Sequence, residues 1–176
     1  MAPSFAAASE PGHTTEMSNF EIVHVAGDDD LEDVRALFLD YAASIGFSLA
    51  FQGFDRELAE LPGRYAPPGG LLLLVRVAGE VAGCGAFRRL DEQICEMKRL
   101  FVRPAFHGRG LGRRIAEELI EEGHRGGYAA MRLDTVPTMN AAIRLYESLG
   151  FLDIEPYIDN PIDGARFMEL RLSKSC

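Results

Sequence analysis

The chain has 176 residues, of which 47% are hydrophobic and 26% are charged, a composition that is typical of one globular domain and argues against disorder. Its 18 Lys and Arg and 27 Asp and Glu give a net charge of −9, which disfavours a protein that binds nucleic-acid backbones. The longest apolar run, residues 71–75, is far shorter than the roughly 20 residues of a membrane-spanning helix.

The first part of the chain predicts a tail, a strand and a helix. Residues 1–18 are rich in Ala, Pro, Ser and Thr without periodicity, so we predict a disordered tail before a domain over residues 19–176. Alternating apolar residues predict a strand over residues 20–25. Three aspartates, residues 28–30, offer an N-cap to a helix with apolar residues at helical spacing, which Gly46 ends.

The middle of the chain predicts a long connection and three strands. Residues 47–70 are aromatic and rich in Pro and Gly around a short helix from about Asp55, and a connection of this length is either a lid or a plain loop. Tight turns join the strands that follow into an antiparallel meander. These strands are expected over residues 71–78, 81–90 and 94–102.

The last part alternates helices and strands. A glycine-rich turn precedes a helix that ends around residues 123–127. Then follow a strand over residues 131–134, a helix over residues 137–149 capped by Gly150, and strands near residues 151–155 and 166–172. This order predicts the α/β (α+β) class, with one mixed, mostly antiparallel sheet flanked by helices.

The segment most informative about function is residues 96–120, where a strand leads through a glycine turn directly into a helix. Glycines let backbone N–H groups approach an anion, and the helix N-terminus adds the equivalent of about half a positive charge. Three arginines add positive potential to an otherwise acidic chain. The segment therefore predicts a phosphate or pyrophosphate site. Its glycines are Gly108, Gly110 and Gly112, and its arginines are Arg109, Arg113 and Arg114.

Other uses of this turn stay open. In a chain with 18 glycines it could be ordinary turn chemistry. A dinucleotide-binding fingerprint would need G-x-G-x-x-G inside a parallel strand–helix–strand unit, and here the turn follows an antiparallel meander. A nucleotide-hydrolysing loop would need a Lys followed by Ser or Thr, and the turn has neither, so nucleotide hydrolysis is disfavoured.

Two runs together resemble the GCN5-related N-acetyltransferase (GNAT) family. Residues 100–112, L-F-V-R-P-A-F-H-G-R-G-L-G, are similar to the family's acetyl-CoA motif, although His107 stands where Gln or Arg is usual. Residues 142–151, A-I-R-L-Y-E-S-L-G-F, are similar to its second motif, a helix followed by Y-x-x-x-G-F, although Met139 stands where Asn is frequent. The resemblance covers residues 20–173 and implies a sheet splayed at an acetyl-CoA site.

The resemblance implies how the donor would be held. Backbone groups of Leu100 and Val102 would pair with the pantetheine arm like an added strand, and amides of residues 108–113 would hold the pyrophosphate. The implied cofactor-binding residues are Leu100, Phe101, Val102, His107, Gly108, Arg109, Gly110, Leu111, Gly112 and Arg113.

The resemblance also implies two catalytic residues. Tyr146 matches a tyrosine that gives a proton to the departing CoA thiolate, and its other interpretation is a core residue of an amphipathic helix. Glu96 is similar in place to a catalytic carboxylate that takes the proton of the amine, directly or through water. Glu96 alternates with Lys98 and could instead form a cross-strand ion pair.

Candidates for the acceptor pocket come from two aromatic loops that would flank the thioester. Each of them could equally be structural. The main candidates are Tyr41, Arg64, Tyr157 and Asn160, with Phe51, Gln52, Tyr65 and Asp159 beside them.

Cysteine and histidine usage predicts neither disulfides nor a metal centre. The three cysteines are an odd number without a C-x-x-C pair, which favours reduced thiols in a cytoplasm-like compartment. Neither Cys84 nor Cys95 has a neighbouring His or helix N-terminus, so a cysteine nucleophile is disfavoured. The four histidines are scattered and no H-E-x-x-H occurs, so we expect no metal.

The sequence thus predicts an enzyme that moves the acetyl group of acetyl-CoA to a primary amine by direct attack in a ternary complex. A small-molecule amine is the expected acceptor, and nucleic acid and membrane are not expected partners. A homodimer is an expectation from the family. Two rival functions are a non-catalytic acyl-CoA-binding sensor module of the same fold and a nucleotide-binding α/β domain.

Overall fold

The computed structural model describes residues 19–172, so the predicted tail over residues 1–18 lies outside the described residues. Within them, seven strands form one sheet in the order β1-β2-β3-β4-β5-β7-β6. The strands are β1 (Phe20–His24), β2 (Leu71–Val77), β3 (Glu80–Arg89), β4 (Ile94–Val102), β5 (Ala130–Thr135), β6 (Leu152–Ile154) and β7 (Arg166–Arg171). Neighbouring strands are antiparallel except β4 and β5, which are parallel. The predicted mixed, mostly antiparallel sheet is confirmed.

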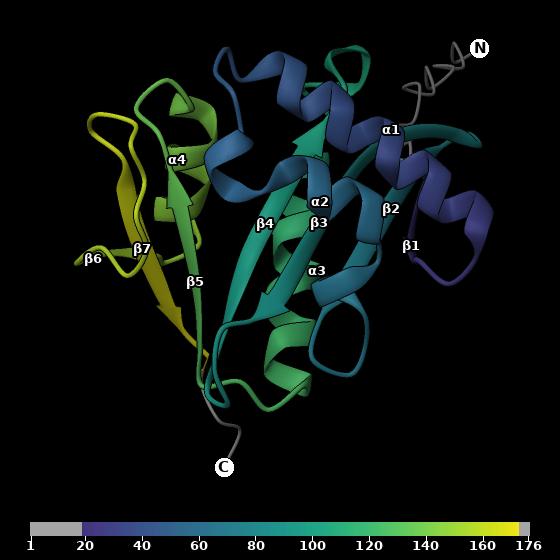
Figure 1. Ribbon diagram of the computed structural model, residues 1–176. Coiled ribbons are helices and arrows are strands. Elements are labelled where there is room, and N and C mark those ends of the chain that lie inside the picture. The colour runs from purple at the N-terminus through teal and green to yellow at the C-terminus, as the bar shows by residue number, and fades with distance from the viewer. Residues whose placement is uncertain (1–18, 173–176) are drawn as a thin grey trace, which may run out of the picture.

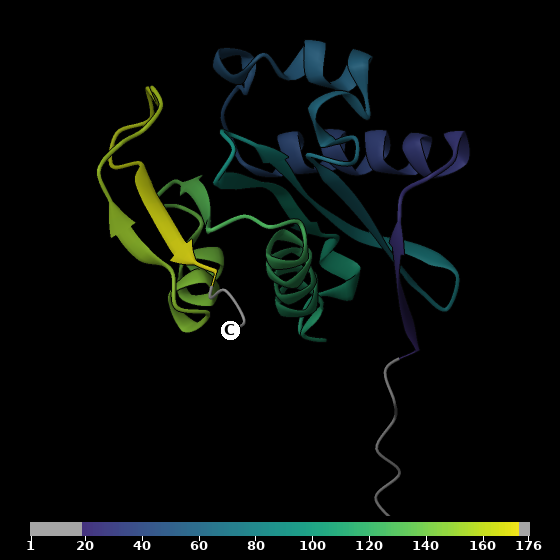
Figure 2. The same ribbon diagram turned by 90° about the horizontal axis from the view of Figure 1, so that it is seen from below.

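Helices cover both faces of the sheet. The α-helices are α1 (Asp28–Ser44), α2 (Phe54–Glu60), α3 (Leu111–Arg125) and α4 (Asn140–Ser148). Short 3-10 turns lie at η1 (Ala50–Gln52), η2 (Gly63–Tyr65) and η3 (Pro104–Phe106). Figure 2 shows α1 and α2 on one side of the sheet and α3 and α4 on the other. Within residues 19–172, no helix combines the length and the apolar character needed to cross a membrane.

Strand β2, next to the edge strand β1, shows why both faces of the sheet are covered. Its five leading residues are all buried. Leu71 and Leu73 pack in the core that includes α3, whereas Leu72 and Leu74 pack in the core that includes α1. Because side chains alternate along a strand, an uninterrupted apolar run needs an apolar partner on each side.

Two predicted helix starts differ from the structure by a few residues. The N-cap of α1 is Gly27, and the three aspartates lie in the first turn, where their charges favour the helix dipole. The helix predicted from residue 137 begins at Asn140. The reason is a turn in which the Met139 N–H donates to the Val136 carbonyl before the helix starts.

The sheet divides between β4 and β5. Only the first three residues of β4 pair with β5, and the last pair is Glu96 with Arg132. Beyond that pair the two strands diverge, as Figure 1 shows for the teal and green strands. The edge of β4 that faces β5 therefore offers backbone N–H and C=O groups that no strand pairs with after Glu96. This divergence is the splay that the family resemblance implies.

Close packing of α3 on β3 depends on Gly85. A Cβ at this position would lie 2.5 Å from Ile115 Cγ2 and 2.9 Å from Leu119 Cδ1. Ile115 is branched at Cβ and fully buried, so it has little freedom to move aside. We expect Gly85→Ala to lower the free energy of unfolding by about 1–3 kcal/mol, measured by urea denaturation.

The control for this variant is Gly27→Ser. Gly27 has open space around the Cβ position and an extended backbone with φ −123°. Serine is a favoured N-cap residue, so this change should leave stability equal or slightly higher. Equal stability of Gly85→Ala and the parent chain would show that α3 does not need this close approach.

Candidate functional site

A groove of about 580 Å³ lies where the edge of β4 faces α4 and the start of α3. Its volume is within the usual range for small-molecule sites. The lining is mostly apolar and comes from β4, the loop after it, the first turn of α3 and α4. It consists of Tyr41, Ser44, Leu100, Phe101, Val102, Pro104, Phe106, His107, Gly108, Gly110, Leu111, Gly112, Thr138, Met139, Asn140, Ala141, Ala142 and Leu145.

One end of the groove is the glycine turn. Gly108 and Gly110 have φ of +77° and +73°, a backbone conformation that favours glycine, and α3 begins at Leu111 directly after them. Gly110 is the N-cap and offers no side chain to the helix. Within residues 19–172, the N–H groups of Gly108–Arg113 donate no hydrogen bond. A run of free amides at a helix start is suited to an anion.

The side chains around the turn, unlike these amides, already contact other parts of the protein. The His107 ring donates from Nε2 to the Val102 carbonyl at 2.7 Å, which ties the turn to the end of β4. Arg113 donates to Ser148 Oγ on α4, and Arg109 lies over the Phe106 ring. Neither arginine lines the groove. Of the ten predicted cofactor residues, the other eight do line it.

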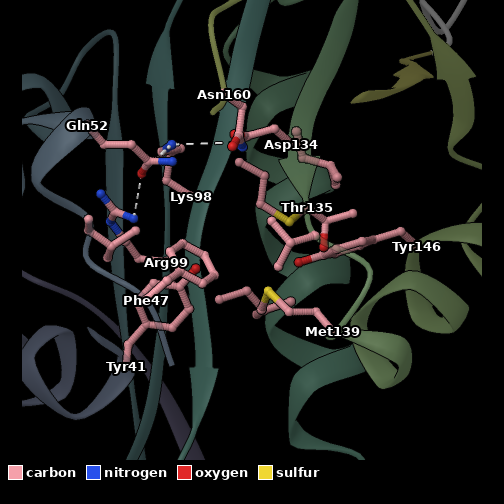
Figure 3. Close-up of a pocket in the computed structure, with 15 residues that line it drawn as sticks. Tyr41, Phe47, Gln52, Lys98, Arg99, Asp134, Thr135, Met139, Tyr146 and Asn160 are labelled. Carbon is pink, nitrogen blue, oxygen red and sulfur yellow. Dashed lines mark hydrogen bonds and ion pairs between the residues drawn. The ribbon is translucent and has the colours of Figure 1, made fainter. Parts of the chain in front are cut away.

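The other end of the groove leads into a small polar cavity of about 40 Å³. Three residues, Tyr41, Leu100 and Met139, line both spaces. Figure 3 shows the side chains that surround this cavity. Its lining consists of Tyr41, Phe47, Leu49, Gln52, Met97, Lys98, Arg99, Leu100, Leu133, Asp134, Thr135, Val136, Met139, Tyr146 and Asn160.

Tyr146 reaches the cavity from α4. Its ring packs edge-on against Phe151 with 5.8 Å between ring centroids, so the side chain has core packing and also lines the cavity. Its hydroxyl makes no hydrogen bond with the described residues, and Figure 3 shows that oxygen directed inward beside Thr135. Burial raises the pKa of Tyr146 above its ordinary value, so the phenol keeps its proton at neutral pH.

A buried ion pair lies across the divergence of β4 and β5. Lys98 Nζ is 3.6 Å from Asp134 Oδ1, and the two side chains are 4% and 6% exposed. Asn160 donates to the other Asp134 oxygen at 3.0 Å. Burial lowers the pKa of Lys98, and the Asp134 charge opposes this effect. Asp134 is therefore the carboxylate that faces the cavity.

Glu96 is fully buried but does not line the cavity. Its Oε1 accepts a hydrogen bond from Arg88 Nε at 2.9 Å, and its Oε2 accepts one from the Tyr157 hydroxyl at 2.7 Å. Arg88 is the residue opposite Glu96 on β3, so the cross-strand ion pair is formed with this arginine. The role of Glu96 as a base stays a prediction.

The structure brings together only some of the predicted acceptor residues. Tyr41, Gln52 and Asn160 line the cavity, whereas Tyr157 does not line it and donates its hydroxyl to Glu96. Arg64 does not: its guanidinium donates to the Arg89 carbonyl, and it lines a separate hollow. The remaining candidates, Phe51, Tyr65 and Asp159, are also absent from the cavity lining.

Sequence reasoning missed four polar residues of the cavity: Lys98, Arg99, Asp134 and Thr135. A signal was present, because two adjacent cations inside a largely apolar strand and an acid near the end of another are unusual in a core. Their meeting depends on which strands are neighbours, and β4 and β5 are far apart in the chain.

The thiols and possible metal ligands lie elsewhere. Cys84 and Cys95 are free and buried, and burial raises the pKa of Cys95 to about 12. Burial likewise raises the pKa of Cys84, so both stay as unreactive thiols at neutral pH. Among residues 19–172, one group could hold a metal ion, His24 with Glu118 and Glu122, and none of these lines the groove or the cavity.

Comparison with known proteins gives one family. The acetyltransferase (GNAT) family model matches residues 32–151. An uncharacterized N-acetyltransferase of Schizosaccharomyces pombe is 41% identical over 159 residues, which cover 89% of this chain and 98% of that protein. Two solved structures are each 26% identical. One, described as an acyl-CoA N-acyltransferase from Klebsiella pneumoniae, has a TM-score of 0.69 and covers 89% of this chain and 99% of its own. The other, yncA of Salmonella typhimurium with its cofactor acetyl-CoA, has a TM-score of 0.67 and covers 89% and 96%.

Proposed function

Because the chain belongs to the acetyltransferase (GNAT) family, and is thus an acetyl-CoA-dependent acyltransferase, we propose that it acetylates the primary amine of a small molecule. The observation that carries the proposal is the junction of the apolar groove with the polar cavity at Leu100. A donor in the groove would place its reacting end at this junction. An amine in the cavity could then attack it directly in a ternary complex.

The residues of the groove fit acetyl-CoA, which supplies an acyl thioester when bound. The unpaired edge of β4 beyond Glu96 suits the amides of the pantetheine arm, because strand addition needs a free row of N–H and C=O groups. The free amides of Gly108–Arg113 suit the pyrophosphate. The Val102 carbonyl already accepts from His107, so we assign the pairing mainly to the backbone around Leu100.

An ammonium cannot attack a thioester, so the cavity must take up a proton. We assign this step to Asp134, because its carboxylate lines the cavity and Glu96 does not. Lys98 and Asn160 hold the Asp134 side chain in place. Glu96, acting directly or through water, is the alternative base, and in our assignment it positions Arg88 and Tyr157.

Tyr146 completes the transfer as the proposed acid. The new bond joins the amine nitrogen to the acetyl carbon, and the carbon–sulfur bond breaks. The nitrogen loses two protons in total. One leaves to solvent by way of Asp134, and the other replaces the proton that the Tyr146 hydroxyl gives to the sulfur. The raised pKa of Tyr146 keeps this hydroxyl protonated before the transfer.

Gly110→Asp tests the donor site. Aspartate would place a negative charge beside the proposed pyrophosphate position, and repulsion should weaken acetyl-CoA binding about tenfold or more. Titration calorimetry with acetyl-CoA measures the dissociation constant. The matched control is Gly79→Asp, since Gly79 also has positive φ (+83°) and open space but lies in the β2–β3 turn. Equal affinity of the two variants would contradict the assignment of the glycine turn.

Release of CoA thiol across a broad panel of amines tests the reaction itself. Turnover of at least one amine is expected. Tight acetyl-CoA binding without any thiol release would instead favour the non-catalytic sensor module.

The two buried cysteines bear on the compartment of the protein. The buried free thiols of Cys84 and Cys95 support a reducing, cytoplasm-like compartment as our proposal. A homodimer, and the absence of nucleic-acid and membrane partners, stay predictions from the sequence.

A further inference from the structure

A second phenol, that of Tyr41, lies at the junction of the groove and the cavity. Tyr41 belongs to the last turn of α1 and is one of the three residues that line both spaces. Figure 3 shows the hydroxyl oxygens of Tyr41 and Tyr146 turned toward the middle of the cavity from opposite sides. The proposed reaction uses the Tyr146 hydroxyl and leaves the Tyr41 hydroxyl at this junction without a role.

The Tyr41 hydroxyl has a proton to donate and an oxygen that a bound molecule can reach. Within residues 19–172, the tyrosine hydroxyls that donate a hydrogen bond are those of Tyr65, Tyr128 and Tyr157. In the same part of the chain, the side-chain polar atoms that are fully enclosed without a partner belong to Arg99 and Thr135, not to Tyr41. The Tyr41 oxygen therefore borders the open space of the cavity.

The Tyr41 ring is held by the two residues that flank Leu100 on β4. Phe101 packs edge-on against it with 6.1 Å between ring centroids, and the Arg99 guanidinium carbon lies 5.7 Å from its centroid. Arg99 is itself fixed, because its Nε donates to Glu57 Oε2 at 2.8 Å and its side chain is 2% exposed. The phenol is thus preorganised beside Leu100, where the groove meets the cavity.

A bulge in β4 accompanies the placement of Arg99 beside this ring. The pairing of β3 with β4 shifts register between Cys84 and Ala86, and Arg99 has φ +59°, which a side chain other than glycine rarely adopts. Lys98 and Arg99 both contact Gln52 Oε1, at 3.3 and 2.9 Å, although adjacent residues of a regular strand point to opposite faces. Strained backbone of this kind is concentrated at functional sites.

The protonation of Tyr41 suits a hydrogen-bond donor. Burial raises the pKa of Tyr41, and the nearby charge of Arg99 opposes this effect. The phenol therefore keeps its proton at neutral pH. The same charge makes the Tyr41 side of the junction more favourable for an anion than for a second cation.

Two atoms of a thioester gain negative charge during acetyl transfer. The carbonyl oxygen gains it first, when the amine attacks and the electron pair of the C=O bond moves onto oxygen. The sulfur gains it afterwards, when the C–S bond breaks. The Tyr146 hydroxyl is the proposed partner of the sulfur, so the carbonyl oxygen is the atom that still needs a donor.

We propose that Tyr41 is a further catalytic residue, whose hydroxyl donates a hydrogen bond to the thioester carbonyl oxygen and stabilises the charge that develops there. The inference rests on the proposed acetyl transfer and extends its mechanism. Tyr41 keeps its proton throughout, because the electron pair on oxygen reforms the C=O bond as the C–S bond breaks and the sulfur takes its proton from Tyr146. Contact with the acceptor, the role predicted from the sequence, is the alternative.

The first test observes the carbonyl group directly. Acetyl-CoA isotope-labelled at the thioester carbonyl carbon is bound without an amine, and infrared difference spectroscopy measures the C=O stretch. A hydrogen bond to the oxygen weakens the C=O bond, so the stretch should lie at a lower frequency in the parent chain than in Tyr41→Phe. Tyr146→Phe should keep the frequency of the parent. An identical frequency in the parent and in Tyr41→Phe would overturn the inference.

The second test is kinetic. Tyr41→Phe should lower kcat about a hundredfold, as loss of one oxyanion donor does, and leave KM for the amine nearly unchanged. The melting temperature should stay the same, because phenylalanine keeps the packing on Phe101 and the hydroxyl donates no hydrogen bond to the described residues. The matched control is Tyr128→Phe, which should keep the kcat of the parent, since Tyr128 donates to the Gly69 carbonyl and lines neither space.

The outcomes separate the inference from the function on which it rests. A raised KM for the amine with an unchanged kcat in Tyr41→Phe would return Tyr41 to the acceptor pocket and overturn the inference. An unchanged infrared band in Tyr41→Phe, beside thiol release by the parent, would overturn the inference alone. Absence of thiol release with every amine would overturn the proposed function, and the inference with it.

Discussion

Replacing Tyr146 with phenylalanine is expected to lower kcat about a hundredfold or more, the range that loss of a general acid produces. The affinity for acetyl-CoA should stay the same, because Tyr146 lines the acceptor cavity and not the groove. Its hydroxyl makes no hydrogen bond with the described residues, and its ring packs on Phe151, so phenylalanine keeps the packing. Steady-state kinetics and calorimetry with acetyl-CoA measure the two quantities.

Tyr128→Phe is the matched control for this variant. Tyr128 is equally buried, but its hydroxyl donates to the Gly69 carbonyl at 2.6 Å and lies outside both spaces. This control should lose about 1 kcal/mol of stability and retain its kcat. A Tyr146→Phe chain with the kcat of the parent would remove Tyr146 from the mechanism and leave it as a core residue.

Replacing Asp134 with asparagine should lower kcat/KM for the amine about a hundredfold or more, because the proposed proton acceptor is lost. The change keeps the shape of the side chain. It also leaves Lys98 without its ion partner in a buried place, so the variant should melt at a lower temperature than the parent. The kcat/KM values of the variant and the parent are therefore compared at a temperature at which both chains are folded. Binding of acetyl-CoA, measured by calorimetry, shows that they are.

Glu96→Gln decides between the two carboxylates. If Asp134 is the base, this change should affect kcat/KM much less than Asp134→Asn, since the glutamine oxygen can still accept from Arg88 and its NH2 group can donate to the Tyr157 hydroxyl oxygen. A larger loss in Glu96→Gln than in Asp134→Asn would return the base role to Glu96 and reduce Asp134 to a partner of Lys98.

Much of the fold was predictable from local patterns. The apolar run over residues 71–75 predicted strand β2, and the tight turn at Gly79 predicted the hairpin that follows. Apolar spacing in α3 gave a helix whose buried residues include Leu111, Ile115 and Leu119. Such elements are predictable because their signals lie within a few residues of one another.

The arrangement of the site was less predictable, because it depends on neighbours that are distant in the chain. The glycine turn and Tyr146 lie in motifs that the sequence displays directly. Asp134 reaches Lys98 only because β5 pairs with the start of β4 and then diverges from it. The direction of Arg99 depends on a bulge, and no propensity rule places an arginine at positive φ. Arg64 was predicted to line the acceptor pocket but lines a separate hollow. The sequence of an aromatic loop does not indicate which hollow its arginine lines.

The short ladder between β4 and β5 links stability to catalysis. Three residue pairs hold the half of the sheet that carries β1 to β4 against the half that carries β5 to β7. A donor whose amides pair with the β4 backbone around Leu100 would act as a removable strand between the two halves. Each turnover would then assemble and dismantle part of the sheet. Resistance to unfolding would rise with donor concentration and fall as the product leaves.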